Sequence, residues 1–302
     1  MSISPATDPK PIPWKNPLLK YRLVTAAVLI SIAIAIFFLG TPPQEYKPLT
    51  RSIDWDLTAQ NSAPNLVVVP RQFEDSLPAD LATWTVAARK RAFVDTVLPL
   101  VLRENERLLA DRGRLLILAS RRTSGRQMVV TDQAWLASML VQYRVLRGDI
   151  NELLHRVDVV PPSLALAQAA EESGWGTSRF ARMGNALFGQ WTFKAGAGMV
   201  PMGREQGASH EVKAYRELMH SVRDYIKNLN THRAYRDLRQ LRAGYRDQNL
   251  RPVGLELTTA LARYSARGAD YVHSLQTIIR VNDLGRFDGA RLDDQQLAAL
   301  NP

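Results

Sequence analysis

Apolar residues along the chain fall into two patterns, one continuous and one periodic. The continuous pattern is LVTAAVLISIAIAIFFLG, from Leu23 to Gly40, whose eighteen residues carry no charge and are polar only at Thr25 and Ser31. At about 1.5 Å per residue, a helix of this length approaches the hydrocarbon thickness of a bilayer, roughly 30 Å. The run therefore predicts one N-terminal transmembrane helix over residues 23–40.

The charges on either side of this run predict its orientation. Positive residues precede it at Lys10, Lys15, Lys20 and Arg22, whereas the next two positive charges after it are offset by acidic neighbours. Because positive flanks stay in the cytoplasm, we expect residues 1–22 to form a cytoplasmic tail. Everything after about residue 41 is then extracytoplasmic.

A cleaved signal peptide is the alternative interpretation of the same run. The apolar core of a signal peptide is usually roughly 7–15 residues long and is followed by small residues at a cleavage site. Here Phe37, Phe38 and Leu39 lead into Gly40, Thr41 and two prolines, without an A-x-A pattern. The sequence therefore favours an uncleaved anchor.

The periodic pattern occupies most of the remaining chain. Residues 41–83 show little periodicity and predict an extracytoplasmic linker with a short strand at residues 66–69, and residues 289–302 predict a C-terminal tail. Between them, residues 84–288 repeat apolar positions at helical spacing. We expect one mainly α-helical (α+β) domain over that range.

Several helices of this domain can be placed from the pattern. Phe93 and Leu100 lie on one face of a helix that Pro99 should kink or break. Another helix is expected to begin at Ser221, and a last one should cover residues 269–281.

Composition narrows the chemistry that the domain can perform. The chain has 302 residues, is 46% hydrophobic, contains no cysteine and carries a formal net charge of +10. Without cysteine, thiolate metal sites, disulfides and cysteine nucleophiles are excluded. The five histidines show no metal-ligand spacing and there is no phosphate loop, so we expect no metal and no cofactor. The positive charge suits nucleic acid, anionic lipid, an anionic wall polymer or simply a solvated surface, and the extracytoplasmic placement argues against nucleic acid.

Residues 161–191, PPSLALAQAAEESGWGTSRFARMGNALFGQW, predict a core helix that ends in two acids. Ser163 can cap its start and Gly174 can end it. Burial and the negative end of the helix dipole both raise the pKa of a carboxyl group in the last turn, as a general acid requires. Because neighbouring helix positions point about 100° apart, only one of the two acids can face a cleft squarely. The residues alone leave both Glu171 and Glu172 as candidates.

Side chains suited to sugars follow these acids. Trp175, Phe188 and Trp191 offer flat apolar faces to sugar rings, and Asn185 and Gln190 offer amides to acetamido groups. The structural alternative is that the acids are a solvated helix end and that the tryptophans belong to the core.

The motif A-Q-A-A-x-E-S-G-W-G-x-S-R-F-A-x-x-G-N-x-L-F-G-Q-W in this stretch resembles the signature of the glucosaminidase family, glycoside hydrolase family 73. Residues 153–162, 228–235 and 264–268 are similar to the Bax-like branch of that family. The resemblance covers roughly residues 88–285 and implies a lysozyme-like, mainly helical fold. It also implies hydrolysis of the β-1,4 bond between N-acetylglucosamine and N-acetylmuramic acid. The partner would then be the glycan strands of peptidoglycan, with the anchor in the bacterial cytoplasmic (inner) membrane and the domain in the periplasm.

The resemblance also implies roles for individual residues. The glutamate directly before Ser-Gly-Trp-Gly is the general acid of the family, which selects Glu172. The second functional position of the family is a tyrosine, which Tyr264 matches, although the residues after it follow the Bax-like form. Many members place a second carboxylate in a β-hairpin after the motif, and residues 199–215 predict a hairpin or an extended loop. Glu205 and Glu211 are the candidates there.

Two questions stay open on the sequence. A substrate-assisted route, in which the 2-acetamido group attacks, would need only Glu172 and a positioning residue such as Tyr264. The chain could also be a non-catalytic peptidoglycan-binding or scaffold protein, or a basic envelope protein that binds anionic polymers or lipid. Protein partners cannot be inferred.

Overall fold

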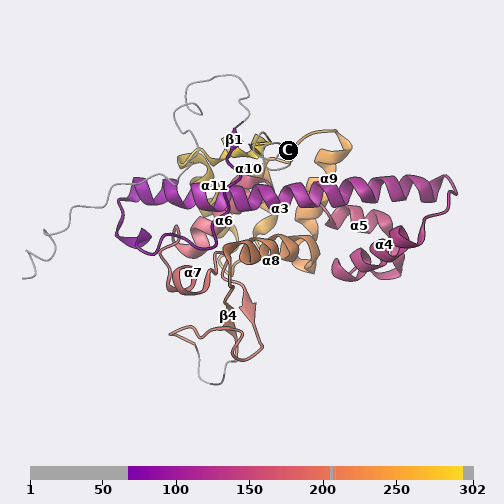
Figure 1. Cartoon of the computed structure of the whole chain (residues 1–302). Coiled ribbons are helices and arrows are strands. Elements are labelled where there is room, and N and C mark those ends of the chain that lie inside the picture. The colour runs from indigo at the N-terminus through magenta and orange to yellow at the C-terminus, as the bar shows by residue number, and fades with distance from the viewer. Residues whose placement is uncertain (1–66, 205–206, 208, 295–302) are drawn as a thin grey trace, which may run out of the picture. The chain divides into compact units, whose positions relative to one another are not determined.

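The structure, a computed structural model, describes residues 67–204, 207 and 209–294. These residues form mostly helices, with two small sheets (Figure 1). The mainly α-helical (α+β) class is therefore confirmed, and the likeness to the lysozyme fold stays a prediction. The α-helices are α3 (Val86–Thr123), α4 (Val130–Gln142), α5 (Ile150–Arg156), α6 (Pro162–Ser173), α7 (Arg179–Gly184), α8 (Leu218–Thr231), α9 (Arg236–Asp247), α10 (Gly254–Leu257) and α11 (Ala269–Val281). The 3-10 helices are η1 (Leu81–Thr83), η2 (Leu146–Gly148), η3 (Arg233–Tyr235), η4 (Thr258–Leu261) and η5 (Leu284–Gly289).

Helix α3 runs through Pro99 without a break, so the expected break at this residue is wrong. A proline in a helix interior costs about 3 kcal/mol. Apolar side chains on both sides of Pro99, among them Phe93 and Leu108, are buried, and the helix contacts α5, α6 and α8. This burial outweighs the lost hydrogen bond, and the result is one helix of 38 residues.

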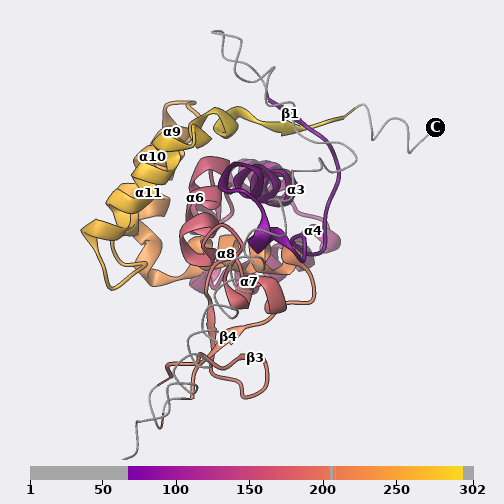
Figure 2. The same ribbon diagram turned by 90° about the vertical axis from the view of Figure 1, so that its left-hand side faces the viewer.

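Helix α6 lies between α3 and α11 (Figure 2) and also contacts α10 and η5. It begins at Pro162, and Ser163 does not cap it as expected. Instead, the backbone N–H of Ser163 donates to Asp288 Oδ1 at 2.9 Å. Because Pro161 and Pro162 have no N–H group, Ser163 carries the first amide that needs an acceptor, and a carboxylate from η5 provides it.

Two other predicted helices are present. Helix α11 has the predicted range, and α8 begins three residues before the expected start at Ser221. The polar face of α8 contrasts with a buried face that includes Val222, Tyr225, Ile226 and Leu229. The i, i+3, i+4, i+7 spacing therefore identified the side of α8 that packs on α3.

One small sheet is formed by strands from the middle of the described chain, and the other by strands from its two ends. Strands β2 (Trp191–Thr192), β4 (Glu211–Lys213) and β3 (Gly198–Met199) form an antiparallel sheet in that order, where a hairpin or extended loop was expected. Strand β1 (Val68–Val69) pairs in parallel with β5 (Arg291–Leu292). The strand expected near residues 66–69 is therefore present, and the described fold continues past both limits of the predicted domain.

The predicted transmembrane helix, residues 23–40, lies outside the described residues. So do the tail at residues 1–22 and the last residues of the C-terminal tail. Within the part of the chain that the structure describes, no helix is long and apolar enough to cross a bilayer. The anchor stays a prediction.

A buried carboxylate, Asp158, joins α3 and α9 to the segment after α5. Its oxygens lie 2.7 Å from Arg246 Nη2, 3.6 Å from Arg112 Nη1 and 3.8 Å from Arg242 Nε. Burial alone would raise the pKa of Asp158, but the hydrogen bond from Arg246 and the charges of Arg242 and Arg112 outweigh it and lower that pKa. Since Arg242 is only 1% exposed, this carboxylate compensates a fully buried cation.

We expect Asp158→Asn to destabilise the protein by about 3–5 kcal/mol, because a buried arginine loses its counter-ion. Asp132→Asn is the matched control, since Asp132 also pairs with two arginines, Arg114 and Arg121, but these are more exposed. Its cost should stay below about 1 kcal/mol. The free energy of unfolding of the full chain in urea at pH 7 measures both.

The effect of Asp158→Asn should also depend on pH. Because folding lowers the pKa of Asp158, its stabilisation is complete above the pKa of the unfolded chain, about 4, and is lost as pH falls through the lower folded pKa. The wild type and the variant should thus converge in acid. Equal costs for the two substitutions, or a difference that grows on acidification, would contradict the role given to Asp158.

Candidate active site

Glu172 lies in the last turn of α6, which ends where the chain becomes left-handed. Gly174, Trp175 and Gly176 have φ values of 58°, 56° and 80°, a conformation that favours glycine. A Cβ on Gly176 would also lie 2.6 Å from Leu77 Cδ1. The Gly-Trp-Gly segment thus allows a tight reversal of the chain directly after the carboxyl group.

Glu172 is half-buried, and the pKa of its carboxyl group is raised. Burial is the main cause, and the negative charge of Glu171 raises the pKa further. A hydrogen bond from Tyr271 and the charge of Arg267 act in the opposite direction without cancelling the rise. A carboxyl group that stays protonated above its usual range can act as a general acid.

A chain of hydrogen bonds determines the direction in which Tyr271 donates. The Tyr225 hydroxyl donates to Gln168 Oε1 at 2.7 Å, and Gln168 Nε2 donates to the Tyr271 hydroxyl oxygen at 3.0 Å. With its oxygen accepting from Gln168, the Tyr271 hydroxyl donates its own proton to Glu172. Because the carbonyl oxygen of a carboxylic acid is the better acceptor, this bond favours the acidic proton on the other oxygen of Glu172.

Tyr225, Tyr235, Tyr264 and Tyr271 form a tyrosine cluster around Glu172. The ring of Tyr264 stacks on Tyr271, with centroids 5.5 Å apart and planes 2° apart, and lies 5.8 Å from the ring of Tyr235. Burial, followed by neighbours that include Glu172, raises the pKa of both Tyr235 and Tyr264. The structure therefore places the two predicted catalytic residues, Glu172 and Tyr264, beside each other.

Tyr264 also fixes the loop that follows α7. Its hydroxyl donates to the backbone oxygen of Phe188 at 3.2 Å. The next residue, Gly189, has φ 59°, and a Cβ there would lie 3.6 Å from Glu172 Oε2. The loop therefore passes close to the carboxyl group but presents no side chain to that oxygen.

Glu171, the other candidate, has different partners. Its carboxylate pairs with Arg267 Nη1 at 2.6 Å and accepts from Ser274 Oγ at 2.9 Å. The Glu171 carboxyl group is thus occupied by one cation and one hydroxyl group. The geometry thus separates two acids that the residues alone left equivalent, and it favours Glu172 as the one that carries a proton.

Two aromatic rings expected to bind sugar are part of the packed interior. Phe188 is 2% exposed and stacks on Tyr225, with centroids 3.8 Å apart. Trp175 is half-buried, meets Phe93 edge-on at 5.6 Å and lies under Lys90 Nζ at 4.8 Å. For Phe188 the expected exposed face is therefore corrected, because its ring supports Tyr225 from inside the core.

The two predicted amides join the loop after α7 to the segment before α8. Asn185 Nδ2 donates to the backbone oxygens of Tyr215 and Arg216 at 3.2 and 3.1 Å. Gln190 Oε1 accepts from the Tyr215 hydroxyl at 2.6 Å. Asn185 thus binds backbone oxygens, which differs from its expected role as a sugar contact. The Gln190 side chain is half-exposed, and the bond from Tyr215 uses its amide oxygen rather than its amide nitrogen.

The small sheet presents aromatic side chains to solvent. Trp191 on β2 is 59% exposed and stacks on His210, with ring centroids 4.4 Å apart. Phe193, which sequence reasoning missed, is 74% exposed. Exposed rings of this kind suit sugar faces.

Glu205 and Glu211 were the candidates for a second catalytic carboxylate, and the contacts of Glu211 in the described structure do not include Glu172. Glu211 on β4 is buried, and its two oxygens accept from the backbone N–H groups of Gly196 and Gly198 at 3.1 and 2.9 Å. These bonds close the turn between β2 and β3, which is a structural role. Glu205 lies outside the described residues, so its role stays a prediction.

Residues 148–284 match a family model named Glucosaminidase, described as mannosyl-glycoprotein endo-beta-N-acetylglucosaminidase. The chain is also 34% identical over 203 residues to Protein bax of Escherichia coli (strain K12), across 64% of this chain and 70% of that protein. The chain belongs to the glucosaminidase family. Membership makes it a glycoside hydrolase.

A solved structure also shows a likeness to this glucosaminidase. The catalytic domain of the autolysin Auto from Listeria monocytogenes is 19% identical, with a TM-score of 0.31 over 56% of this chain and 97% of that domain. A likeness of this size does not fix the fold.

Residues of this site that sequence reasoning missed are Gln168, Tyr225, Tyr235, Tyr271 and Gly189. One signal was present for part of the set. Gln168 is a polar residue within an apolar core helix, and a buried amide requires hydrogen-bond partners on both its oxygen and its nitrogen. The identity of those partners depends on how α8 and α11 pack against α6, which the sequence pattern does not give.

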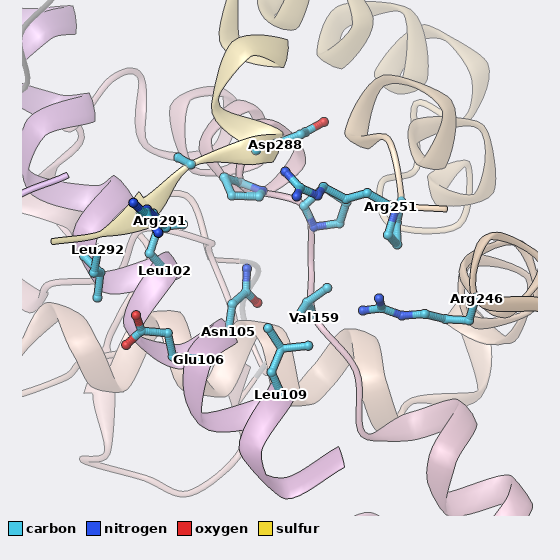
Figure 3. Close-up of a pocket in the computed structure, with 15 residues that line it drawn as sticks. Leu102, Asn105, Glu106, Leu109, Val159, Arg246, Arg251, Asp288, Arg291 and Leu292 are labelled. Atoms are coloured by element: carbon cyan, nitrogen blue, oxygen red, sulfur yellow. The ribbon is translucent and has the colours of Figure 1, made fainter. Parts of the chain in front are cut away.

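A pocket of about 400 Å³ near the start of α6 is separate from this site (Figure 3). Its wall includes Leu102 and Leu109 of α3, the two prolines at the start of α6, and Arg246 and Arg251. Glu172 lies ten residues further along α6, about 15 Å along the helix axis. A sugar held in this pocket would therefore not reach Glu172.

Substitutions beside Glu172 should move its pKa in opposite directions. Tyr271→Phe removes a hydrogen bond that lowers the pKa of Glu172, so the pKa should rise. Glu171→Gln removes a negative charge that raises it, so the pKa should fall. Side-chain carboxyl ¹³C shifts, titrated by NMR in the full chain, measure both, and the signal missing from Glu172→Gln assigns the resonance. Shifts of the same sign in the two variants would contradict this account of the site.

Proposed function

We propose that the chain hydrolyses the β-1,4 bond between N-acetylglucosamine and N-acetylmuramic acid in peptidoglycan, with Glu172 as the general acid. The observation that carries this proposal is the environment of Glu172. Its carboxyl group has a raised pKa, accepts from Tyr271 and lies next to Gly189, which covers it with no side chain. Family membership supplies the reaction class, glycoside hydrolysis.

The hydrogen bond from Tyr271 orders the first step. One Glu172 oxygen accepts from Tyr271, so the other oxygen donates its proton to the glycosidic oxygen. The bond between that oxygen and C1 then breaks, and the leaving sugar departs with the proton. Glu172 is left ionised, and the same Tyr271 hydroxyl stabilises the carboxylate because hydrogen bonds strengthen with charge.

The group that attacks C1 is the second half of the proposal. In a substrate-assisted route the oxygen of the 2-acetamido group attacks C1, and water later opens the ring that forms, with Glu172 accepting the proton of that water. This route is favoured because, among the described residues, Tyr271 is the side chain that hydrogen-bonds Glu172, and because Glu211 binds backbone amides instead. Tyr264 would position the loop that contains Gly189.

The exposed rings at the small sheet are evidence for a polymeric substrate. Trp191 and Phe193 expose their rings. Gln190 precedes Trp191 in sequence and follows Gly189, the residue that lies close to Glu172. A glycan strand bound across these residues would stack sugars on the rings on one side of the scissile bond.

Anchoring to the bacterial inner membrane is a separable part of the proposal. It is supported by the uncharged run at residues 23–40 and by the positive residues before it. The catalytic domain would then lie in the periplasm, where the glycan strands are. Membrane fractionation of the full chain beside a chain without residues 23–40 tests this part alone.

We expect Glu172→Gln in the full chain to release muropeptides from purified sacculi about 10²–10⁴-fold more slowly than the wild type, because the proton donor is lost. Glu171→Gln is the matched control, and it should retain most of its activity at mildly acidic pH. Borohydride reduction followed by mass spectrometry should place N-acetylglucosamine at the new reducing ends.

Three results would count against the proposal. Equal release by wild type and Glu172→Gln would remove Glu172 from the acid role. Reduced N-acetylmuramic acid at the new ends would contradict the bond assigned. Co-sedimentation with sacculi without any release would favour a non-catalytic wall-binding protein.

A further inference from the structure

Arginines gather in a pocket of about 810 Å³ formed by α5, η3, α9 and the segment before Tyr264. The charged side chains that line it are Glu152, Arg156, Arg233, Arg236, Arg239 and Arg263. One carboxylate therefore faces five guanidinium groups. Because like charges this close repel one another, the arrangement needs an explanation.

Elsewhere in the described fold, arginines share carboxylates. Asp158 pairs with three arginines and Asp132 with two, and Glu104 pairs with Arg107 and Arg223. In this pocket Glu152 pairs with Arg156 at 2.5 Å. The other four arginines of the pocket have no ion-pair partner among the described residues. The fold thus concentrates uncompensated positive charge at one place.

Arg239 shows that part of this charge is built into the interior. It is only 4% exposed, and its Nη1 donates to the backbone oxygens of Leu229 and His232, both at 3.0 Å. Burial, and then the charges of Arg156 and Arg236, lower the pKa of Arg239, while Glu152 opposes this. An anion in the pocket would relieve both penalties.

The pocket borders the tyrosine cluster. Arg263 directly precedes Tyr264, and Arg236 directly follows Tyr235. The rings of Tyr235 and Tyr264 lie 5.8 Å apart, and the charge of Glu172 contributes to the raised pKa of both tyrosines. An anion in the pocket would therefore lie beside the glycan that Glu172 acts on.

We propose that this pocket binds carboxylate groups of the peptide stems that branch from the glycan strand, so that the enzyme selects strands that still carry peptides. The inference deepens the proposed function and rests on it for the identity of the strand. Guanidinium groups bind carboxylates through paired hydrogen bonds. The sugar rings themselves are largely neutral, whereas peptide stems carry several carboxylates, and the volume of the pocket suits a short peptide segment rather than a single ion.

The test compares peptide-bearing glycan strands with peptide-free strands, from which an amidase has removed the peptides and on which the lactyl carboxylates that this cleavage frees have been converted to amides. The triple variant Arg233→Gln, Arg236→Gln, Arg263→Gln removes exposed pocket arginines whose side chains make no hydrogen bond or ion pair with the described residues. The matched control is Arg126→Gln, Arg280→Gln, Arg291→Gln, which removes the same charge from exposed positions outside this pocket. All are made in the full chain with Glu172→Gln, so that strands stay intact during binding measurements.

We expect the pocket variant to bind peptide-bearing strands about tenfold more weakly than its parent, and to bind peptide-free strands as well as the parent does. The control variant should resemble the parent on both. A soluble stem peptide should compete with peptide-bearing strands, and the same peptide with its carboxylates amidated should not.

Equal weakening on both kinds of strand, equal weakening by the control variant, or competition by the amidated peptide would overturn the inference. So would a pocket variant that binds like its parent. Turnover by the chains with Glu172 restored is measured in parallel. If no chain releases muropeptides but the peptide-dependent binding is present, the proposed hydrolysis fails and the inference about the pocket stands.

Discussion

The side-chain amide of Gln168 lies in the buried apolar part of α6, and its burial is tolerable because both of its polar ends are hydrogen-bonded. Its oxygen accepts from Tyr225 on α8 and its nitrogen donates to Tyr271 on α11. This one residue therefore orients both helices against α6, and because it donates to the Tyr271 oxygen, it leaves the Tyr271 proton to be donated to Glu172. Packing of the core and protonation of the acid depend on the same amide. Replacing it by an apolar residue would preserve the volume and lose the direction of the hydrogen bonds.

Helix α6 can hold that amide in place because both of its ends are fixed by groups distant in sequence. At its start, Asp288 accepts from the N–H groups of Ser163 and Gly254 at 2.9 and 2.8 Å. At its end, the left-handed Gly-Trp-Gly segment reverses the chain and packs Gly176 against Leu77. Glu172 is thus positioned by tertiary contacts on a rigid helix, which suits a group that must meet a substrate atom within a fraction of an ångström.

How far the sequence could predict this arrangement depends on the range of the interactions. Helix α11 and the buried face of α8 follow from apolar spacing, and the family motif selected Glu172 and Tyr264. The prediction of a break at Pro99 was wrong because the burial of apolar side chains along α3 outweighs the local tendency of proline to end a helix. The prediction that Ser163 caps α6 was wrong because a carboxylate 125 residues away, Asp288, accepts the hydrogen bond at the start of the helix. Phe188 and Asn185 looked like sugar contacts, yet their partners on α8 and before it could be identified only from the folded chain.

The site also has to keep two opposite electrostatic conditions apart. A general acid needs a raised pKa, which nearby cations would lower. Among the described residues, the cation that lowers the pKa of Glu172 is Arg267, and its charge is shared with Glu171. Burial and the arginines of the pocket lower the pKa of Arg239 instead, and Tyr235 and Tyr264, whose rings lie 5.8 Å apart, are each next in sequence to a pocket arginine. Polarisable but uncharged rings can separate a cationic pocket from a neutral acid while keeping them close enough for one branched substrate to reach both.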